Sequence, residues 1–143
     1  MSIHQISVFL ENRTGQLAQI TKLLADEHVD IRAISIAETT DYGLVRMIVS
    51  DVQKASSILL ESGSILSMTP VYAVEVPDRP AGLSELLEVL AENHVDVEYM
   101  YSLFTRKDNI AYMILRISDE KNFLNVIQSS SIKLASNEIL GLK

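Results

Sequence analysis

The second half of this chain repeats the first half with changes, and this repeat limits the folds that the sequence can adopt. Residues 6–49 align with residues 72–115 at one offset, since His28 corresponds to His94 (94−28=66). A repeat of this length indicates two copies of one supersecondary unit rather than one continuous domain. The sequence therefore predicts a tandem architecture.

The predicted domains divide the chain near its middle. We expect one domain over residues 1–69 and a second over residues 70–143, with Pro70 at the boundary. A unit of roughly 70 residues has a marginal core on its own. We therefore expect the two units to pack on each other or on a second chain, and a homodimer is the predicted assembly.

Hydrophobic periodicity predicts the same order of elements in both copies. Alternation of apolar and polar residues indicates strands, and apolar residues three or four positions apart indicate helices. The order β-α-β-β-α-β is the ferredoxin-like unit, so the predicted fold class is α+β, with antiparallel sheets and helices on one face. Helices are expected to begin at Leu17, Val52, Leu83 and Asp119. Strands are expected over residues 3–10, 31–37, 44–49, 65–68, 71–76, 97–104, 110–117 and 132–135, with a short extra strand over 138–142.

Composition and charge exclude several classes of function. The net charge of −7 and the isoelectric point near 4.9 argue against binding to nucleic-acid phosphates or to anionic membranes. The absence of cysteine removes disulfides and thiolate chemistry. No apolar run approaches the ~18 residues of a membrane span, and the first residues lack the pattern of a signal peptide. A cytoplasmic protein is expected.

The histidines are the first candidates for catalysis or metal binding. His28 and His94 each stand after a predicted helix and before a strand, where a left-handed backbone is common. Histidine is enriched in that conformation, so we interpret both as helix-end residues rather than metal ligands. Neither a nucleophile elbow nor a phosphate-binding or dinucleotide motif is present. The sequence predicts no enzyme activity, no metal and no cofactor.

A turn-rich loop connects the first strand to the first helix in each copy: loop 1 is residues 12–17, and loop 2 is residues 78–83. The first N–H groups of a helix lack partners inside the helix, and they suit a carboxylate. In loop 1, Gly15 permits close approach of a ligand, and Asn12 offers a donor and an acceptor. The alternative is a plain strand-to-helix turn that Thr14 caps.

These loops and their spacing to the next strand resemble the ACT domain family. Its signature is Asp/Asn-Arg-Pro-Gly-x-Leu, a helix that ends in Leu-Ala-x-x-Gly, and a strand that opens with Ile-Asn-Ile. The first copy matches it with loop 1, residues 24–28 and residues 29–31, and the second copy with loop 2, residues 90–94 and residues 95–97. The resemblance covers essentially the whole chain.

The chain departs from the signature at several positions. Thr14 replaces the proline of loop 1, and the glycine of loop 2 is displaced by one position, because Ala81 precedes Gly82. Histidine replaces the glycine at both helix ends. Asp30 and Asp96 replace the strand asparagine, and an acidic residue there favours an ammonium group over a carboxylate.

The resemblance implies that a free amino acid binds where two such domains pair. The loop and strand positions that hold the head group in the family correspond here to Asn12 with Asp30 and to Asp78 with Asp96. We favour loop 1, because its glycine stands at the family's position. The predicted ligand-binding residues are Asn12, Arg13, Thr14, Gly15, Gln16, Leu17, Asp30, Asp78, Pro80, Ala81, Gly82, Leu83 and Asp96.

Three functions compete at this point. The favoured one is a non-catalytic sensor that binds a free amino acid and changes its affinity for a partner. The alternative is a detached regulatory subunit of an amino-acid biosynthetic enzyme. A small enzyme on a ferredoxin-like scaffold is the third, since a fold does not fix a function. Tyr99 and Tyr101 are candidates to line an aromatic-tolerant pocket, and equally to belong to the core.

Overall fold

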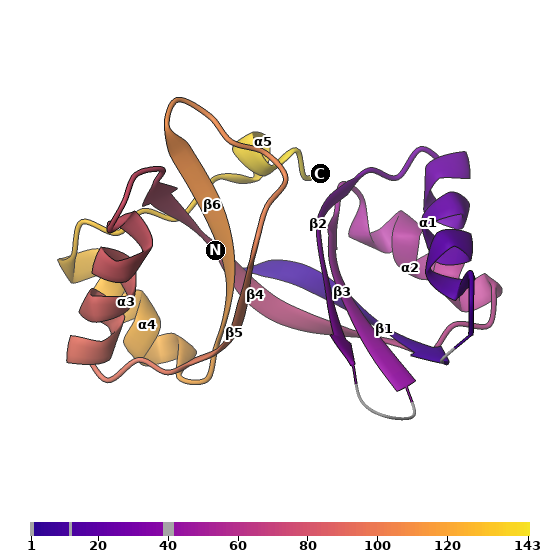
Figure 1. Ribbon diagram of the computed structural model, residues 1–143, viewed down its shortest axis with the longest axis horizontal. Helices are drawn as coiled ribbons and strands as arrows, with labels where there is room; N and C mark the ends of the chain where they lie inside the picture. The colour runs from indigo at the N-terminus through magenta and orange to yellow at the C-terminus, as the bar shows by residue number, and fades with distance from the viewer. Residues whose placement is uncertain (1, 12, 39–41) are drawn as a thin grey trace. The chain divides into compact units, whose positions relative to one another are not determined.

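The computed structural model describes residues 2–11, 13–38 and 42–143, and it forms two compact units. The N-terminal unit contains His4–Thr69 together with Asn137–Lys143, and the C-terminal unit contains Pro70–Ser136 together with the residues up to Ile3. The predicted α+β class with tandem ferredoxin-like units is confirmed (Figure 1). The predicted domain boundary at residue 70 divides the two sequence repeats, and it stays a prediction. The compact units differ from the repeats at the chain ends, because each end groups with the other unit.

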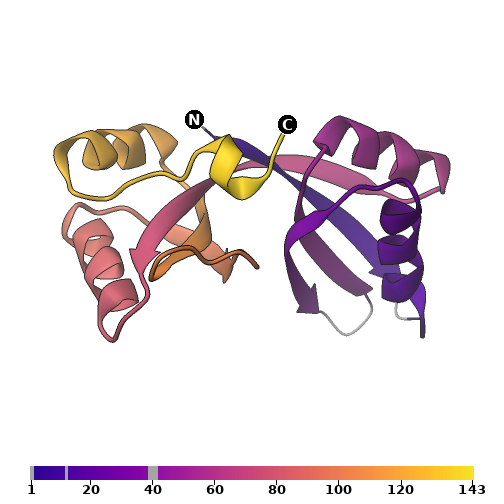
Figure 2. The ribbon, with the colours of Figure 1, turned by 90° about the horizontal axis from the view of Figure 1, so that it is seen from above.

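The N-terminal unit is an antiparallel sheet with two helices on one face (Figures 1 and 2). Its strands lie in the order β2-β3-β1-β4, so β3 and β1 are the inner strands. Ile20 and Leu24 bring the first helix onto the sheet. The elements are β1 (Ile3–Glu11), α1 (Gln16–Asp26), β2 (Ile31–Glu38), β3 (Tyr42–Val49), α2 (Val52–Glu61), the first part of β4 (Leu66–Pro77) and α5 (Asn137–Leu140).

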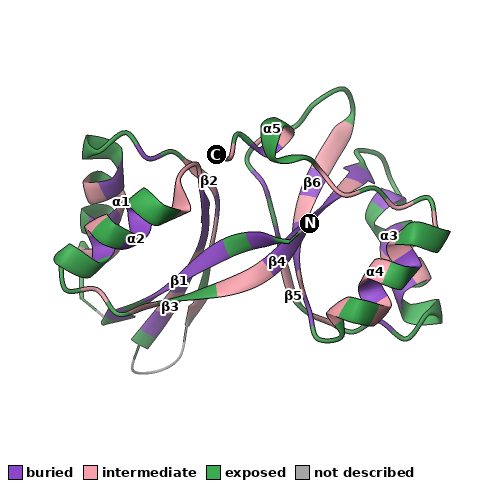
Figure 3. Cartoon of the chain, turned by 180° about the vertical axis from the view of Figure 1, so that it is seen from behind, coloured by how far each residue is buried: buried purple, intermediate pink, exposed green. Residues whose placement is uncertain are grey.

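The C-terminal unit repeats this arrangement with strand order β4-β6-β5. Its core includes Tyr72 and Phe123, whose ring centroids lie 4.9 Å apart, and its inward strand positions are buried (Figure 3). Tyr72 donates a hydrogen bond to Glu120 at 3.0 Å, and burial together with that carboxylate raises the pKa of Tyr72. The further elements are α3 (Gly82–Glu92), β5 (Val97–Ser102), β6 (Ile110–Ile117) and α4 (Glu120–Ser129).

Four predicted strands differ from the structure. The strands expected over 65–68 and 71–76 form one strand, β4, and the strand expected over 132–135 is reduced to a bridge between Leu134 and Val74. The extra strand expected over 138–142 is wrong, because these residues form helix α5. Leu140 is fully buried there, and Gly141 ends the helix at a φ of +71°.

The offset between the two copies is not constant, contrary to the sequence interpretation. Ile6 pairs with Met47 and Tyr72 pairs with Leu115, so the offset is 66 at the first strand (72−6) and 68 at the third (115−47). Between the strands expected over 97–104 and 110–117, the sequence predicts a turn at residues 106–109, and the structure confirms it. Asp108 and Asn109 have φ of 48° and 65°, as a two-residue hairpin turn requires. The sequence also predicts a turn over residues 41–43, of which Asp41 lies outside the described residues and Tyr42 and Gly43 begin β3.

The two helix-end histidines adopt the predicted left-handed backbone. His28 has a φ of 59° and His94 a φ of 57°, and both side chains are exposed. Across the described ranges, no group of three or more histidine and carboxylate side chains is placed to hold a metal ion. No helix in the same ranges is long and apolar enough to cross a membrane.

Candidate functional site

Loop 1 turns sharply between β1 and α1. The N–H of Arg13 donates to Glu11 O at 2.7 Å, and the N–H of Gln16 donates to Arg13 O at 3.3 Å. Gly15 stands at the N-cap with a φ of 86°, and no side chain among the described residues caps the helix, so the interpretation of Thr14 as the cap is wrong. Asn12 lies outside the described residues.

The polar side chains of loop 1 are only partly paired. Arg13 Nε contacts Glu11 Oε2 at 3.1 Å, and both side chains are largely exposed. Such an exposed pair contributes at most ~1 kcal/mol to stability. Gln16 Oε1 is buried and accepts no hydrogen bond from any described residue. A buried acceptor without a donor costs ~1–3 kcal/mol, so this oxygen favours a ligand or water that donates to it.

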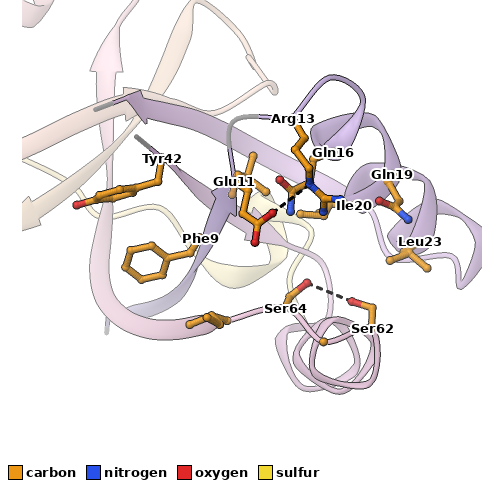
Figure 4. A pocket seen from close by; sticks show the side chains of 13 residues that line it. Phe9, Glu11, Arg13, Gln16, Gln19, Ile20, Leu23, Tyr42, Ser62 and Ser64 are labelled. Carbon is orange, nitrogen blue, oxygen red and sulfur yellow. Dashed lines mark hydrogen bonds and ion pairs between the residues drawn. The ribbon is translucent and has the colours of Figure 1, made fainter. Parts of the chain in front are cut away.

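A cavity of about 350 Å³, which we call cavity 1, lies beside loop 1 in the N-terminal unit (Figure 4). Glu11, Arg13 and Gln16 form a polar part, and residues of α1 and of the connection between α2 and β4 form its walls. The full lining is Phe9, Leu10, Glu11, Arg13, Gln16, Gln19, Ile20, Leu23, Tyr42, Ser62, Gly63, Ser64 and Ile65.

Strand pairing explains the position of cavity 1. The N–H of Phe9 donates to Ile65 O at 3.0 Å, directly before β4 begins. Glu11 therefore extends beyond the start of β4, and it pairs on its other side with Tyr42 of β3. The rings of Phe9 and Tyr42 have centroids 5.6 Å apart. These aromatic residues are absent from the predicted site. The sequence can point to these residues only when the two copies are compared at the corrected offsets of 66 and 68.

A second hollow of about 500 Å³ lies on the other side of loop 1. The predicted residues Arg13, Thr14, Gly15, Gln16 and Leu17 all line it, and two of these, Arg13 and Gln16, also line cavity 1. Each described residue of loop 1 therefore lines this second hollow, and two of them line cavity 1 as well.

The strand aspartates stand apart from the loops of their own units. Asp30 forms an ion pair with Arg32 at 3.0 Å, and its N–H donates to Ser50 Oγ at 2.9 Å. Asp96 is exposed, and its carbonyl accepts from the N–H of Ser118 at 3.5 Å. Neither aspartate lines the hollows beside loop 1.

Loop 2 has a similar backbone with different side-chain pairing. Ala81 occupies the left-handed position with a φ of 70°, and a Cβ on the next residue, Gly82, would overlap the carbonyl oxygen of Pro77. Asp78 accepts from Arg106 at 3.1 Å. Loop 2 therefore requires a glycine at position 82, where the sequence has its displaced glycine, because the backbone leaves no room for a side chain.

The other charges of loop 2 are also paired. Arg79 donates to both carboxylate oxygens of Glu85, at 3.3 and 2.8 Å, and this hydrogen bond lowers the pKa of Glu85. The carbonyl of Pro80 accepts from Arg79 at 3.2 Å. Leu83 is 40% exposed and lines an apolar hollow on the outer face of α3. Loop 2 thus leaves fewer polar groups for a ligand than loop 1.

The counterpart of cavity 1 in the C-terminal unit is smaller and charged. It has a volume of about 220 Å³ and contains Glu75, Pro77, Ile110, Ser131 and Lys133. At the offsets of 66 and 68, these residues are the equivalents of Phe9, Glu11, Tyr42, Gly63 and Ile65, all of which line cavity 1.

Comparisons with known proteins agree with this architecture. The model of the ACT domain pair family matches residues 1–141. A crystal structure of a protein from Bacteroides thetaiotaomicron is 33% identical, covers 99% of this chain and 96% of its own, and superposes with a TM-score of 0.90. No curated protein matches the sequence significantly.

Two more distant structures share the fold. The ligand-free regulatory subunit of aspartate kinase from Thermus thermophilus is 15% identical, with a TM-score of 0.64 and coverage of 88% of this chain and 91% of that one. The alpha and beta subunits of an aspartokinase give 15% identity, a TM-score of 0.55, and coverage of 90% and 95%. Because the family match extends over nearly the whole chain, this protein belongs to the ACT domain pair family.

Proposed function

We propose that the chain is a non-catalytic sensor that binds a free amino acid beside loop 1 and thereby changes its affinity for a partner protein. The observation that carries this proposal is the buried Gln16 Oε1 without a described donor, in the same cavity as the Arg13 guanidinium and the Glu11 carboxylate. This set of groups suits a zwitterion.

The chemistry of the head group follows from the donors and acceptors present. Arg13 can donate charge-assisted hydrogen bonds to the carboxylate, and the N–H groups of Thr14 and Gly15 find no acceptor among the described residues. Glu11 and Gln16 Oε1 can accept from the ammonium group. Because the Glu11–Arg13 pair is exposed, a ligand displaces it at little cost.

A sensor also requires a second state that the ligand binds differently. We propose that two chains pair as a homodimer in the cytoplasm, and that Asp30 or Asp96 of a paired domain meets the ammonium group, as the family resemblance suggests. The ligand then stabilises one arrangement of the pair and so changes a surface that a partner reads.

A thermal-shift screen of the twenty amino acids tests the proposal. A ligand that binds only the native state at a hundred times its Kd stabilises the fold by ~2.7 kcal/mol. We expect at least one amino acid to raise the Tm, and Arg13→Ala to reduce that rise, while the matched variant Arg79→Ala keeps it. No rise with any amino acid at millimolar concentration would contradict the proposal.

The second candidate is a detached regulatory subunit, and the outer face of α3 favours it. Ala81, Leu83, Leu87 and Ala91 line an apolar hollow there, and Leu83 is 40% exposed. Copurification of an amino-acid biosynthetic enzyme with the native chain, and its loss with Leu83→Glu, would support this candidate over a sensor without a bound enzyme.

A further inference from the structure

We infer that the amino acid held in cavity 1 carries an aromatic or large apolar side chain. This inference rests on the proposed function and adds the class of ligand. Cavity 1 has a polar part around Arg13 and Gln16 and an apolar part made by Phe9, Tyr42 and Ile65. In Figure 4, the Phe9 and Tyr42 rings lie on one side of Glu11, and Arg13 and Gln16 lie on the other.

The apolar part is unusually exposed for side chains of this kind. Phe9 is 45% exposed, Tyr42 is 44% exposed and Ile65 is 69% exposed. Single exposed apolar residues are ordinary on protein surfaces, but a group of them beside a polar cavity indicates a binding site. Burial by a ligand would remove this apolar surface from water.

The geometry of the two rings suits a third apolar group. Phe9 and Tyr42 have centroids 5.6 Å apart and an interplanar angle of 46°. Offset and tilted arrangements are the favoured geometries of aromatic contacts, and they leave faces and edges available to another ring. A charged side chain placed against the Phe9 and Tyr42 rings would lose hydration to an apolar surface.

The C-terminal unit shows that the fold does not require these apolar side chains. The N–H of Phe9 donates to Ile65 O at 3.0 Å, and the equivalent N–H of Glu75 donates to Lys133 O at 2.9 Å. The backbone pairing is the same, yet a carboxylate and an ammonium replace the phenyl and the isoleucine side chains. The apolar part of cavity 1 therefore serves something other than strand pairing.

The two cavities also differ in size. Cavity 1 encloses about 350 Å³, within the usual range for small-molecule sites, and the equivalent cavity encloses about 220 Å³. A ligand whose head group contacts Arg13 and whose side chain reaches Phe9 would use both parts of cavity 1. Serine or alanine would leave the apolar part open to water.

Isothermal titration of the full chain tests this inference. We expect L-phenylalanine or L-leucine to bind at least about tenfold more tightly than L-serine, L-aspartate or L-lysine, from the apolar area buried. Phe9→Glu combined with Ile65→Lys gives cavity 1 the charged residues that its counterpart has at these two positions. This double variant should weaken the binding of the preferred ligand by about tenfold or more. The reciprocal pair, Glu75→Phe with Lys133→Ile, should leave that affinity unchanged.

The outcomes separate this inference from the proposed function. Tight binding of L-serine or L-aspartate without binding of L-phenylalanine or L-leucine overturns the inference and leaves the sensor proposal standing. Absence of binding for all twenty amino acids overturns the sensor proposal itself. Unchanged affinity in the double variant overturns the inference, and if that variant does not fold, Tyr42→Ser tests the same surface with the same expected loss.

Discussion

Loop 1 and loop 2 share a backbone path and differ in how their charged groups are paired. In loop 2, Arg79 donates to both carboxylate oxygens of Glu85, at 3.3 and 2.8 Å. In loop 1, the equivalent arginine is Arg13, and Gln19 stands at the position of Glu85. Arg13 Nε contacts Glu11 Oε2 at 3.1 Å. The difference supports the proposal that one copy of a duplicated turn keeps polar groups for a ligand, while the other copy pairs its polar groups internally.

The cavities beside the loops lead to the same conclusion. Phe9 and Ile65 are apolar and exposed in the first copy, and Glu75 and Lys133 replace them in the second. Because the strand pairing is preserved, the replaced side chains are free to diverge. The comparison therefore supports the proposal that the ligand binds to the N-terminal unit.

The largest expected effect concerns α5, which belongs to the N-terminal unit. Leu140 is fully buried, and its carbonyl accepts from Arg32 Nε at 2.8 Å. Leu140→Ala should destabilise the protein by ~2–5 kcal/mol, because it leaves a cavity where the leucine side chain is buried in the N-terminal unit. Denaturant unfolding measures the loss, and Glu138→Ala on the same helix is the exposed control.

Hydrogen exchange on Leu140→Ala then sharpens the comparison between the units. Amide protection should fall in the N-terminal unit before it falls in the C-terminal unit, because stability is not uniform across a structure. Equal loss of protection in both units would show that α5 does not belong to one of them.

A smaller loss is expected at the glycine of loop 2. Gly82→Ala places a methyl group against the carbonyl of Pro77, and overpacking of this kind costs ~1–3 kcal/mol. The equivalent change in loop 1, Gln16→Ala, removes a buried acceptor that has no described donor and places no new atom against a carbonyl, so it should not lower the free energy of unfolding. If both variants show the same stability by urea unfolding, the two loops do not differ in packing as described.

Each loop has one residue with a left-handed backbone, and substitutions at these two residues should change the stability in opposite directions. Ala81 has a φ of 70° and Gly15 a φ of 86°. Ala81→Gly should stabilise the protein by about 1 kcal/mol, and Gly15→Ala should destabilise it by a similar amount, because a Cβ is strained in this region. Thermal unfolding of both variants measures the two shifts, and shifts of the same sign would contradict the equivalence of the loops.

The smallest effect is the pH dependence of the Arg79–Glu85 pair. The hydrogen bond and the charge of Arg79 lower the pKa of Glu85 in the folded state. The stabilisation from this pair is therefore present above the unfolded pKa and disappears as pH falls through the folded pKa. Titration of the Glu85 carboxyl carbon by NMR should show a higher pKa in Arg79→Ala, nearer 4.5. An unchanged pKa would show that the Arg79–Glu85 pair does not form in solution.

Local patterns were enough to predict most of the fold. The spacing of Ile20 with Leu24, and of Leu86 with Leu90, predicts helices that bury those residues, and both helices do so. The histidine positions predict a left-handed backbone at both helix ends, which is confirmed. These features depend on residues within one or two turns of each other, and sequence periodicity reports such contacts directly.

The candidate site could be predicted only in part. Loop 1 was identified from its own residues, but the role of Phe9 and Ile65 depends on a strand pairing between distant segments. The two-residue insertion in the hairpin at Asp108 and Asn109 also moves the equivalent of Ile65 to Lys133. A constant offset of 66 therefore compares the wrong residues after the hairpin. The C-terminal helix was missed because its stability comes from the burial of Leu140 on the other repeat.

The stoichiometry of amino-acid binding tests the central claim most directly. Isothermal titration of the full chain with the amino acid that gives the largest thermal shift should yield one site per chain, since loop 1 and cavity 1 occur once. Arg13→Ala should weaken that site, and Arg79→Ala should leave it unchanged. Two equivalent sites per chain, or a single site that Arg79→Ala removes and Arg13→Ala keeps, would contradict the assignment to the N-terminal unit.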